Sequence, residues 1–169
     1  MNAVAPTTER ELRPPRHQAS RRAIRLWTVR ALLSWLIPVG IQLVVMIAAG
    51  HIAPWQYIAL AVTVLLAAAH TVVMPQWRFR VHRWEATDNA VYTQSGWLNQ
   101  ERRIAPVSRI QTVDSERGPL DQLFKLANVT VTTASAAGPL TIRGLDREVA
   151  DRLVDDLTAR TRRFADDAT

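Results

Sequence analysis

The chain contains no cysteine, so disulfide bonds, iron–sulfur ligation and thiol catalysis are excluded. Lysine is almost as scarce, because Lys125 is the single lysine among 21 basic residues. This preference for arginine, together with abundant alanine, indicates a GC-rich bacterial genome. The four histidines show no spacing typical of a metal pair, and the chain has neither a glycine-rich phosphate loop nor a G-x-S-x-G turn. We therefore expect no metal, no cofactor and no enzymatic activity.

Charge is absent from a long central part of the chain, because no Asp, Glu, Lys or Arg occurs from Ala31 to Trp77. This uncharged run is broken once, at His51–Pro54. An α-helix rises about 1.5 Å per residue, so about 20 apolar residues cross a hydrocarbon core about 30 Å thick. The polar side chains of Gln42 and His70 are expected to contact the other helix or a second subunit. The sequence thus predicts a two-helix transmembrane hairpin over residues 26–77, with helices at about residues 31–50 and 55–76.

Arginines flank the hairpin on both outer sides, whereas the connection between its helices has none. They are Arg21, Arg22, Arg25 and Arg30 before the first helix and Arg78, Arg80 and Arg83 after the second. By the positive-inside rule, both termini are expected in the cytoplasm, with the hairpin crossing the bacterial inner membrane twice. Aromatic residues near the predicted interfaces are expected to act as membrane-interface anchors. These residues are Trp27, Trp55, Tyr57 and Trp77.

Two other interpretations of the apolar stretches fit the sequence less well. A cleaved signal peptide has a shorter polar lead and an apolar region of about 7–15 residues, whereas here a second apolar run follows at once. A buried hairpin of a soluble protein would need a further layer to cover two helices that are apolar all round. The remaining chain is too short and too strand-like to supply that layer.

Basic charge is concentrated before the hairpin. Residues 1–30 carry seven arginines against two glutamates, while residues 78–169 carry 14 basic and 13 acidic side chains. Residues 1–25 are therefore expected to form a flexible basic cytoplasmic arm that is attracted to anionic lipid headgroups. A nucleic-acid-binding protein would carry a basic face on its folded domain. We therefore expect no nucleic-acid partner.

After the hairpin, the pattern changes to short alternating segments that are typical of antiparallel strands. They are residues 78–87, 90–95, 97–104, 108–116, 128–134 and 139–144, with a β-bulge expected in the fourth. A short helical turn is expected at residues 119–126, and a final amphipathic helix follows Asp146 as its N-cap. The predicted fold is a membrane α-hairpin plus an α+β domain at residues 78–165, followed by a tail at 166–169. In this domain, the helix closes a small antiparallel β-barrel or sandwich.

The order of hairpin, strands and closing helix resembles that of the bacterial pleckstrin-homology-like (bacterial PH domain) membrane proteins of the YdbS type. Three segments carry the resemblance: PVSRIQTV at Pro106–Val113, GPLDQLFKLANVTVTTA at Gly118–Ala134, and IRGLDREVADRLVDDL at Ile142–Leu157. It covers about residues 25–160. The resemblance implies a PH-like barrel or sandwich in a membrane setting, and it implies little about biochemical activity.

The candidate binding site lies directly after the hairpin. Arg78 and Arg80 alternate on the first expected strand, so they share one face with His82, and Arg83 follows. These four residues are the candidates for contact with lipid headgroups or with a partner. Basic residues after a membrane helix are, however, also expected from topology alone.

Three hypotheses for the function remain open from the sequence. The preferred one is a membrane-anchored interaction or scaffold module on the cytoplasmic face, which binds a membrane protein partner or another copy of itself. The alternative is a domain that binds anionic lipid headgroups. The third is an accessory subunit of a transporter, or an enzyme whose catalytic groups converge from distant positions.

Overall fold

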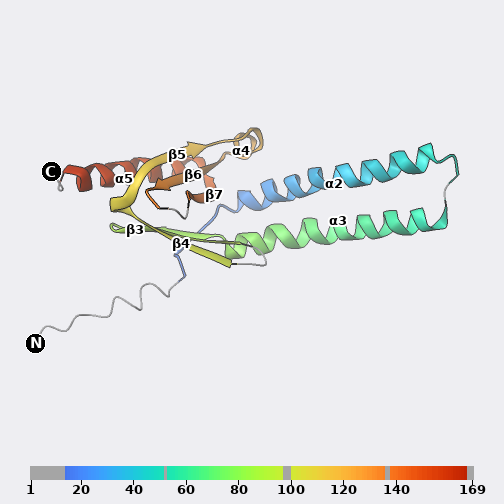
Figure 1. The fold of residues 1–169 in the computed structure, drawn as a ribbon, viewed down its shortest axis with the longest axis horizontal. Helices are drawn as coiled ribbons and strands as arrows, with labels where there is room; N and C mark the ends of the chain where they lie inside the picture. Colours follow the sequence, from blue (N-terminus) through green and yellow to red (C-terminus); the bar gives the residue numbers. More distant parts are fainter. Residues whose placement is uncertain (1–13, 52, 97–99, 136–137, 167–169) are drawn as a thin grey trace, which may run out of the picture.

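The structure is a computed structural model of the whole chain, and it describes residues 14–51, 53–96, 100–135 and 138–166. Its helices are α2 (Arg22–Ala48), α3 (Pro54–Val81), α4 (Pro119–Leu123) and α5 (Arg147–Asp166), with a 3₁₀ turn η1 at Val107–Arg109. Its strands are β1 (His17–Gln18), β2 (Arg83–Ala86), β3 (Ala90–Gly96), β4 (Gln100–Pro106), β5 (Ile110–Glu116), β6 (Leu126–Thr133) and β7 (Leu140–Asp146). Figure 1 shows a long helical hairpin, α2 and α3, that projects from a domain made of the strands, α4 and α5.

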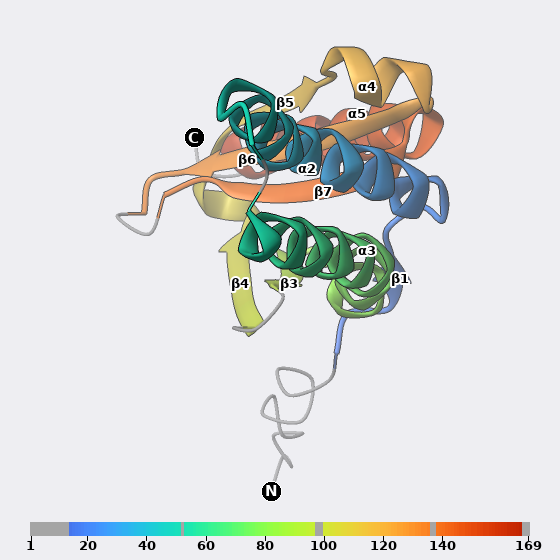
Figure 2. The ribbon, with the colours of Figure 1, turned by 90° about the vertical axis from the view of Figure 1, so that its right-hand side faces the viewer.

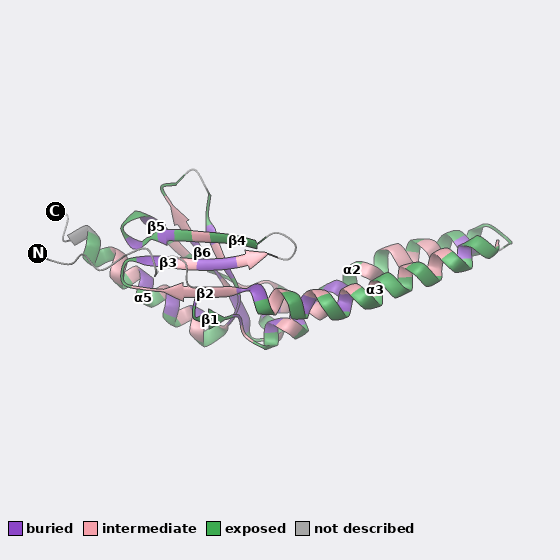
Figure 3. Cartoon of the chain, turned by 90° about the horizontal axis from the view of Figure 1, so that it is seen from below, coloured by how far each residue is buried: buried purple, intermediate pink, exposed green. Residues whose placement is uncertain are grey.

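The two hairpin helices lie side by side and carry their large apolar side chains on the outside. Leu36, Ile37, Ile47 and Leu65 are 64–80% exposed. Figure 3 shows the hairpin almost entirely as exposed or half-buried residues, while the buried residues gather in the domain. No other part of the described chain covers these apolar side chains, so the chain on its own does not form the buried hairpin of a soluble protein. Both helices have the length and composition of membrane spans.

Polar side chains join the two helices within the uncharged run. The Nε2 of Gln42 donates a hydrogen bond to the Oγ1 of Thr63 at 2.8 Å. The Nε1 of Trp35 donates to the Nδ1 of His70 at 3.1 Å. Gln42 and His70 thus make the helix–helix contacts that the sequence predicts for uncharged polar residues in this setting.

The domain is a sandwich of two antiparallel sheets, with strand orders β1-β2-β3-β4 and β5-β6-β7. The pairing of β5 with β6 shifts register between Ile110 and Thr112, within the segment where the sequence predicts a bulge. Val91, Val107 and Val129 are completely buried between the sheets. The predicted antiparallel domain is therefore confirmed as a PH-like sandwich, and its sheets do not close into a barrel.

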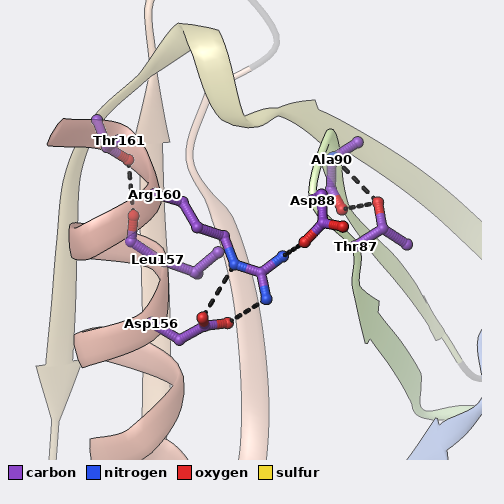
Figure 4. A network of polar contacts seen from close by, with 7 residues as sticks. All are labelled: Thr87, Asp88, Ala90, Asp156, Leu157, Arg160 and Thr161. Carbon is purple, nitrogen blue, oxygen red and sulfur yellow. Dashed lines mark hydrogen bonds and ion pairs between the residues drawn. The ribbon is translucent and has the colours of Figure 1, made fainter. Parts of the chain in front are cut away.

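Helix α5 covers the sandwich, as the sequence predicts. Ala150, Leu153 and Leu157 are at most 5% exposed and pack into the core between the sheets. Figure 4 shows how the helix is also tied to the first sheet by Arg160. Its guanidinium pairs with Asp156 on the preceding turn and donates to the Oδ1 of Asp88, in the β2–β3 turn, at 2.9 Å.

The segment before the hairpin differs from the sequence prediction, which treats residues 1–25 as a flexible arm. His17 pairs with Trp84 and Gln18 pairs with Arg83, so β1 extends the first sheet. The rings of His17 and Trp84 lie 5.0 Å apart, and α2 already begins at Arg22. A strand of two residues is too short to show an alternating pattern in the sequence. Its formation depends on pairing with β2, which follows the hairpin in the chain. Residues 1–13 of the expected arm lie outside the described residues.

The first strand expected after the hairpin is also corrected, because α3 continues through Val81 and β2 begins only at Arg83. No helix-breaking residue separates Trp77 from Val81, and tertiary contacts favour the helix there. Phe79 packs against the cluster at the base of the hairpin, and Val81 is 8% exposed. The expected third strand, at residues 97–104, begins at Gln100 within the described residues.

A second apolar cluster joins the base of the hairpin to the domain. Ala23, Leu26 and Trp27 of α2 pack against Leu126 of β6, and all four are at most 2% exposed. Figure 2, which looks along the hairpin, places α2 beside β6 and β7 and α3 on the side of β3 and β4. The base of the hairpin is therefore packed directly against the domain rather than attached to it by a linker.

Polar contacts reinforce this junction. The backbone N–H of Ser20 donates to the Gly144 carbonyl at 2.8 Å, and its Oγ donates to the Oδ1 of Asp146 at 2.9 Å. Arg30, the last charged residue before the uncharged run, pairs with the buried carboxylate of Asp121 at 2.9 Å. Ser20 thus ties the segment just before α2 to β7, and Arg30 ties α2 itself to α4.

A cationic cleft as the candidate functional site

A cleft with a volume of about 560 Å³ opens between the end of α3 and the domain. Helix α3, His82 after it, and strands β3, β4 and β7 contribute the walls. The lining side chains that the argument uses are His70, Met74, Arg78, His82, Glu101, Arg103 and Arg143. The cleft therefore gathers residues from positions that are far apart in the sequence.

Simple periodicity explains why these side chains converge. His70, Met74 and Arg78 follow one another at i, i+4 and i+8, so they lie on one face of α3. Glu101 and Arg103 alternate along β4 and therefore share a face of their strand. Arg143 is an exposed position of β7, and its two neighbours in the chain, Ile142 and Gly144, are buried.

Positive charge dominates the cleft. Arg103 is partly compensated, because its Nε contacts Glu101 at 2.6 Å and its NH1 donates to the carbonyl of Pro139 at 3.0 Å. Arg78 and Arg143 have no carboxylate within ion-pair distance among the described residues. The guanidinium of Arg78 instead lies 4.7 Å from the ring centroid of Trp27, a cation–π contact. Within the described residues, the charge of these two arginines is therefore not balanced by an acid.

His82 is the buried polar residue of the cleft. It is 8% exposed, and its ring meets that of Trp27 edge-on at 5.4 Å. Burial and, to a smaller extent, the nearby charges of Arg78 and Arg143 together lower the pKa of His82 to about 4. The imidazole is therefore neutral near pH 7. Within the described residues its Nδ1 has no hydrogen-bond partner, although it is buried.

The structure brings together only part of the predicted binding site. Arg78 and His82 line the cleft, but they belong to the end of α3 and to the residue after it. Arg80 is exposed on α3 outside the cleft, and Arg83 lies in β2. The four residues do not share a strand face, because residues 78–81 are helical. Arg143 was missed, since no spacing in the sequence connects it with Arg78.

The predicted aromatic anchors also separate into two groups. Trp55, Tyr57 and Trp77 are 46–64% exposed, near the two ends of α3. Trp27 is 2% exposed and sits inside the junction, so the structure corrects its assignment as an anchor at the membrane interface. Its position is explained by the apolar contacts of α2 with β6 and by the stacked Arg78.

Among the described residues, no group of three or more His, Asp or Glu side chains is placed so that it could hold a metal ion. The polar groups of the cleft are mostly donors rather than ligands for a cation, because arginine has no acceptor. The arrangement is therefore suited to an anion.

A sandwich of four and three antiparallel strands, closed by a C-terminal helix and joined to two long apolar helices, defines a membrane-associated PH-like module. Comparison with known proteins agrees: the bacterial PH domain matches residues 28–161, and the chain belongs to this family. It is 31% identical over 156 residues to the UPF0699 transmembrane protein YdbS of Bacillus subtilis (strain 168), which covers 90% of this chain and 96% of the relative. No solved structure matches the chain.

Proposed function

We propose that this chain is a membrane-anchored interaction module that presents its PH-like domain at the cytoplasmic face and binds a protein partner there. Both α2 and α3 cross the bilayer, and both termini are cytoplasmic, because the arginines lie at the domain end of the hairpin. The partner is a further membrane protein or a second copy of the chain. Membership of the bacterial PH domain family supports an interaction module over a catalytic function.

The observation that carries the proposal is the buried contact between the base of the hairpin and the domain. A flexible tether would be sufficient to keep a domain near the membrane. Here Trp27, Leu26 and Leu126 are at most 2% exposed in a shared cluster, so the domain has a set orientation relative to the two helices. A set orientation suits a module that meets a partner in the same membrane.

The open side of the sandwich is the surface we propose for this partner. Strand β4 is the last strand of its sheet, and a groove of about 440 Å³ lies between it and the second sheet. Ile104 on β4 is 53% exposed, and Arg102 and Arg109 are exposed beside it. An unpaired strand edge accepts an extended segment through backbone hydrogen bonds. The flanking arginines favour a segment that carries carboxylates.

Photo-crosslinking in intact cells tests this function. A photoreactive amino acid at Ile104 is expected to give a specific adduct with a second membrane protein or with another copy of the chain. The same amino acid at Arg152, an exposed position on α5, serves as the matched control. Equal adducts at both positions, together with a monomer in mild detergent, would contradict the proposal.

The alternative function, binding of anionic lipid headgroups, is favoured by one specific observation. Arg78 and Arg143 line a cleft at the base of the hairpin without acidic partners in the described chain. A test with residues 78–169 alone would be misleading, because removal of α2 exposes Leu126 and removes β1. Lipid binding is therefore best measured on the full chain.

A further inference from the structure

The cleft extends across the boundary between the apolar helices and the domain. Arg78 is the first charged residue after the uncharged run, and Met74 and His70 lie within that run on the same face of α3. They are about 6 Å and 12 Å from Arg78 along the helix axis, towards the far end of the hairpin. The wall of the cleft is therefore uncharged at one end and cationic at the other.

We propose that this cleft binds an anionic phospholipid. Its headgroup phosphate contacts Arg78, Arg103 and Arg143, and its acyl chains lie along α3 past Met74 and His70. The inference rests on the membrane crossing of α3 stated above, and it names a site and a ligand for the lipid-binding function. A volume of about 560 Å³ lies within the range of about 300–1,000 Å³ of small-molecule sites.

The charges in the cleft support a phosphate as the ligand. Arg78 and Arg143 are near enough to act on the same imidazole, that of His82, so an anion between them would relieve their mutual repulsion. Arginine binds phosphate oxygens through two parallel N–H donors, which a lysine cannot do. The buried Nδ1 of His82 provides one further polar atom that the described protein leaves unpaired.

Membrane topology alone does not explain this set of residues. The positive-inside rule accounts for basic side chains close to the ends of the spans, which include Arg78 and Arg80. Arg103 and Arg143 belong to β4 and β7, well beyond the hairpin in the sequence. Their placement beside Arg78 is a property of the fold.

The shape of the cleft favours a lipid over a free phosphate ion. A free ion would need only the cationic end, and water would fill the rest of the space. At Met74 the wall continues the apolar surface of α3, where a lipid tail replaces water without loss of hydrogen bonds. The ligand that uses both ends is amphipathic.

Native mass spectrometry of the full chain in dodecyl maltoside tests the proposal. We expect phosphatidylglycerol to be retained at least fivefold more than phosphatidylcholine of the same acyl composition, since only the former carries net negative charge. Arg143→Gln is expected to weaken retention about tenfold, because it removes one charged phosphate contact. Arg143→Lys should restore part of the loss, and Arg152→Gln on α5 should leave retention unchanged.

Arg143 is exposed and outside the apolar cores, so its substitution leaves folding intact, which the melting temperature of each variant checks. Equal retention of the two lipids, or an Arg143→Gln variant that retains phosphatidylglycerol like the wild type, would overturn the proposal. Displacement of the lipid by millimolar inorganic phosphate would also overturn it and assign the site to a free anion. None of these results would alter the crosslinks at Ile104, so failure here is distinguishable from failure of the protein-binding function.

Discussion

His82 links the protonation of one side chain to the stability of the junction. Its ring contacts Trp27, and burial, followed by the charges of Arg78 and Arg143, disfavours the imidazolium. The pKa of about 4 in the folded protein is below the ordinary value of 6.5, so the unfolded chain binds the proton more readily. The resulting stabilisation is complete above pH 6.5 and is lost as the pH falls towards 4.

We predict that the wild-type domain loses about 3 kcal/mol of unfolding free energy between pH 6.5 and pH 4 through this residue. The His82→Gln variant keeps a polar side chain of similar reach but cannot titrate, so its stability should fall less over that interval. Thermal melts followed by near-ultraviolet circular dichroism in detergent measure the difference. Parallel decreases in the two proteins would show that His82 is not the titrating group.

At the scale of elements, the contact between α2 and β7 depends on a glycine. Gly144 has φ +72°, and a Cβ built on it would lie 2.8 Å from the Cβ of Ala23. A side chain at this position would therefore be strained by its backbone and would also push α2 away from the sheet. Gly138 is a natural comparison, because its φ is +77° while no atom lies within 4 Å of the same built Cβ.

We predict that Gly138→Ala costs about 1 kcal/mol, the penalty of the left-handed backbone alone. Gly144→Ala should cost more, by about 1–3 kcal/mol, because steric overlap in a packed site is added. It should also increase proteolysis at the base of the hairpin. Chemical denaturation of both variants checks the order, and equal costs would mean that α2 is not held against β7.

The same elements show which parts of the fold the sequence can predict. The uncharged run and its flanking arginines identify the hairpin, and alternation identifies β3, β5, β6 and β7, because those signals are local. The end of α3 and the strand β1 could not be predicted in this way. Both depend on contacts with residues distant in the chain. Phe79, near the end of α3, packs against the cluster around Trp27, and His17 of β1 pairs with Trp84 of β2.

The candidate site follows the same rule. The sequence identifies Arg78 and His82, because basic residues that directly follow an apolar helix are candidates for contact with headgroups or a partner. It places them on a strand, which is wrong, and it adds Arg80 and Arg83, which the helix and β2 direct away from the cleft. Arg143 becomes recognisable only when β7 is brought beside α3.

For the whole molecule, the central claim is that the hairpin and the domain form one unit whose base carries the cleft. Two interlocked contacts support it: the buried cluster around Trp27 and the pairing of β1, before α2, with β2, after α3. The two helices thus enter and leave the domain through neighbouring strands of one sheet. A domain held in this way keeps both the cleft and the β4 edge at a set position relative to the two long helices.

Electron–electron double resonance tests this claim most directly, because the absence of native cysteine allows two spin labels to be introduced without further changes. Labels at Ile47, at the far end of α2, and at Gln111, in β5, occupy exposed positions. In lipid nanodiscs we predict a single narrow distance distribution that Trp27→Ala broadens. A broad distribution in the wild-type chain would contradict the account, since it would show a domain that moves freely on its membrane helices.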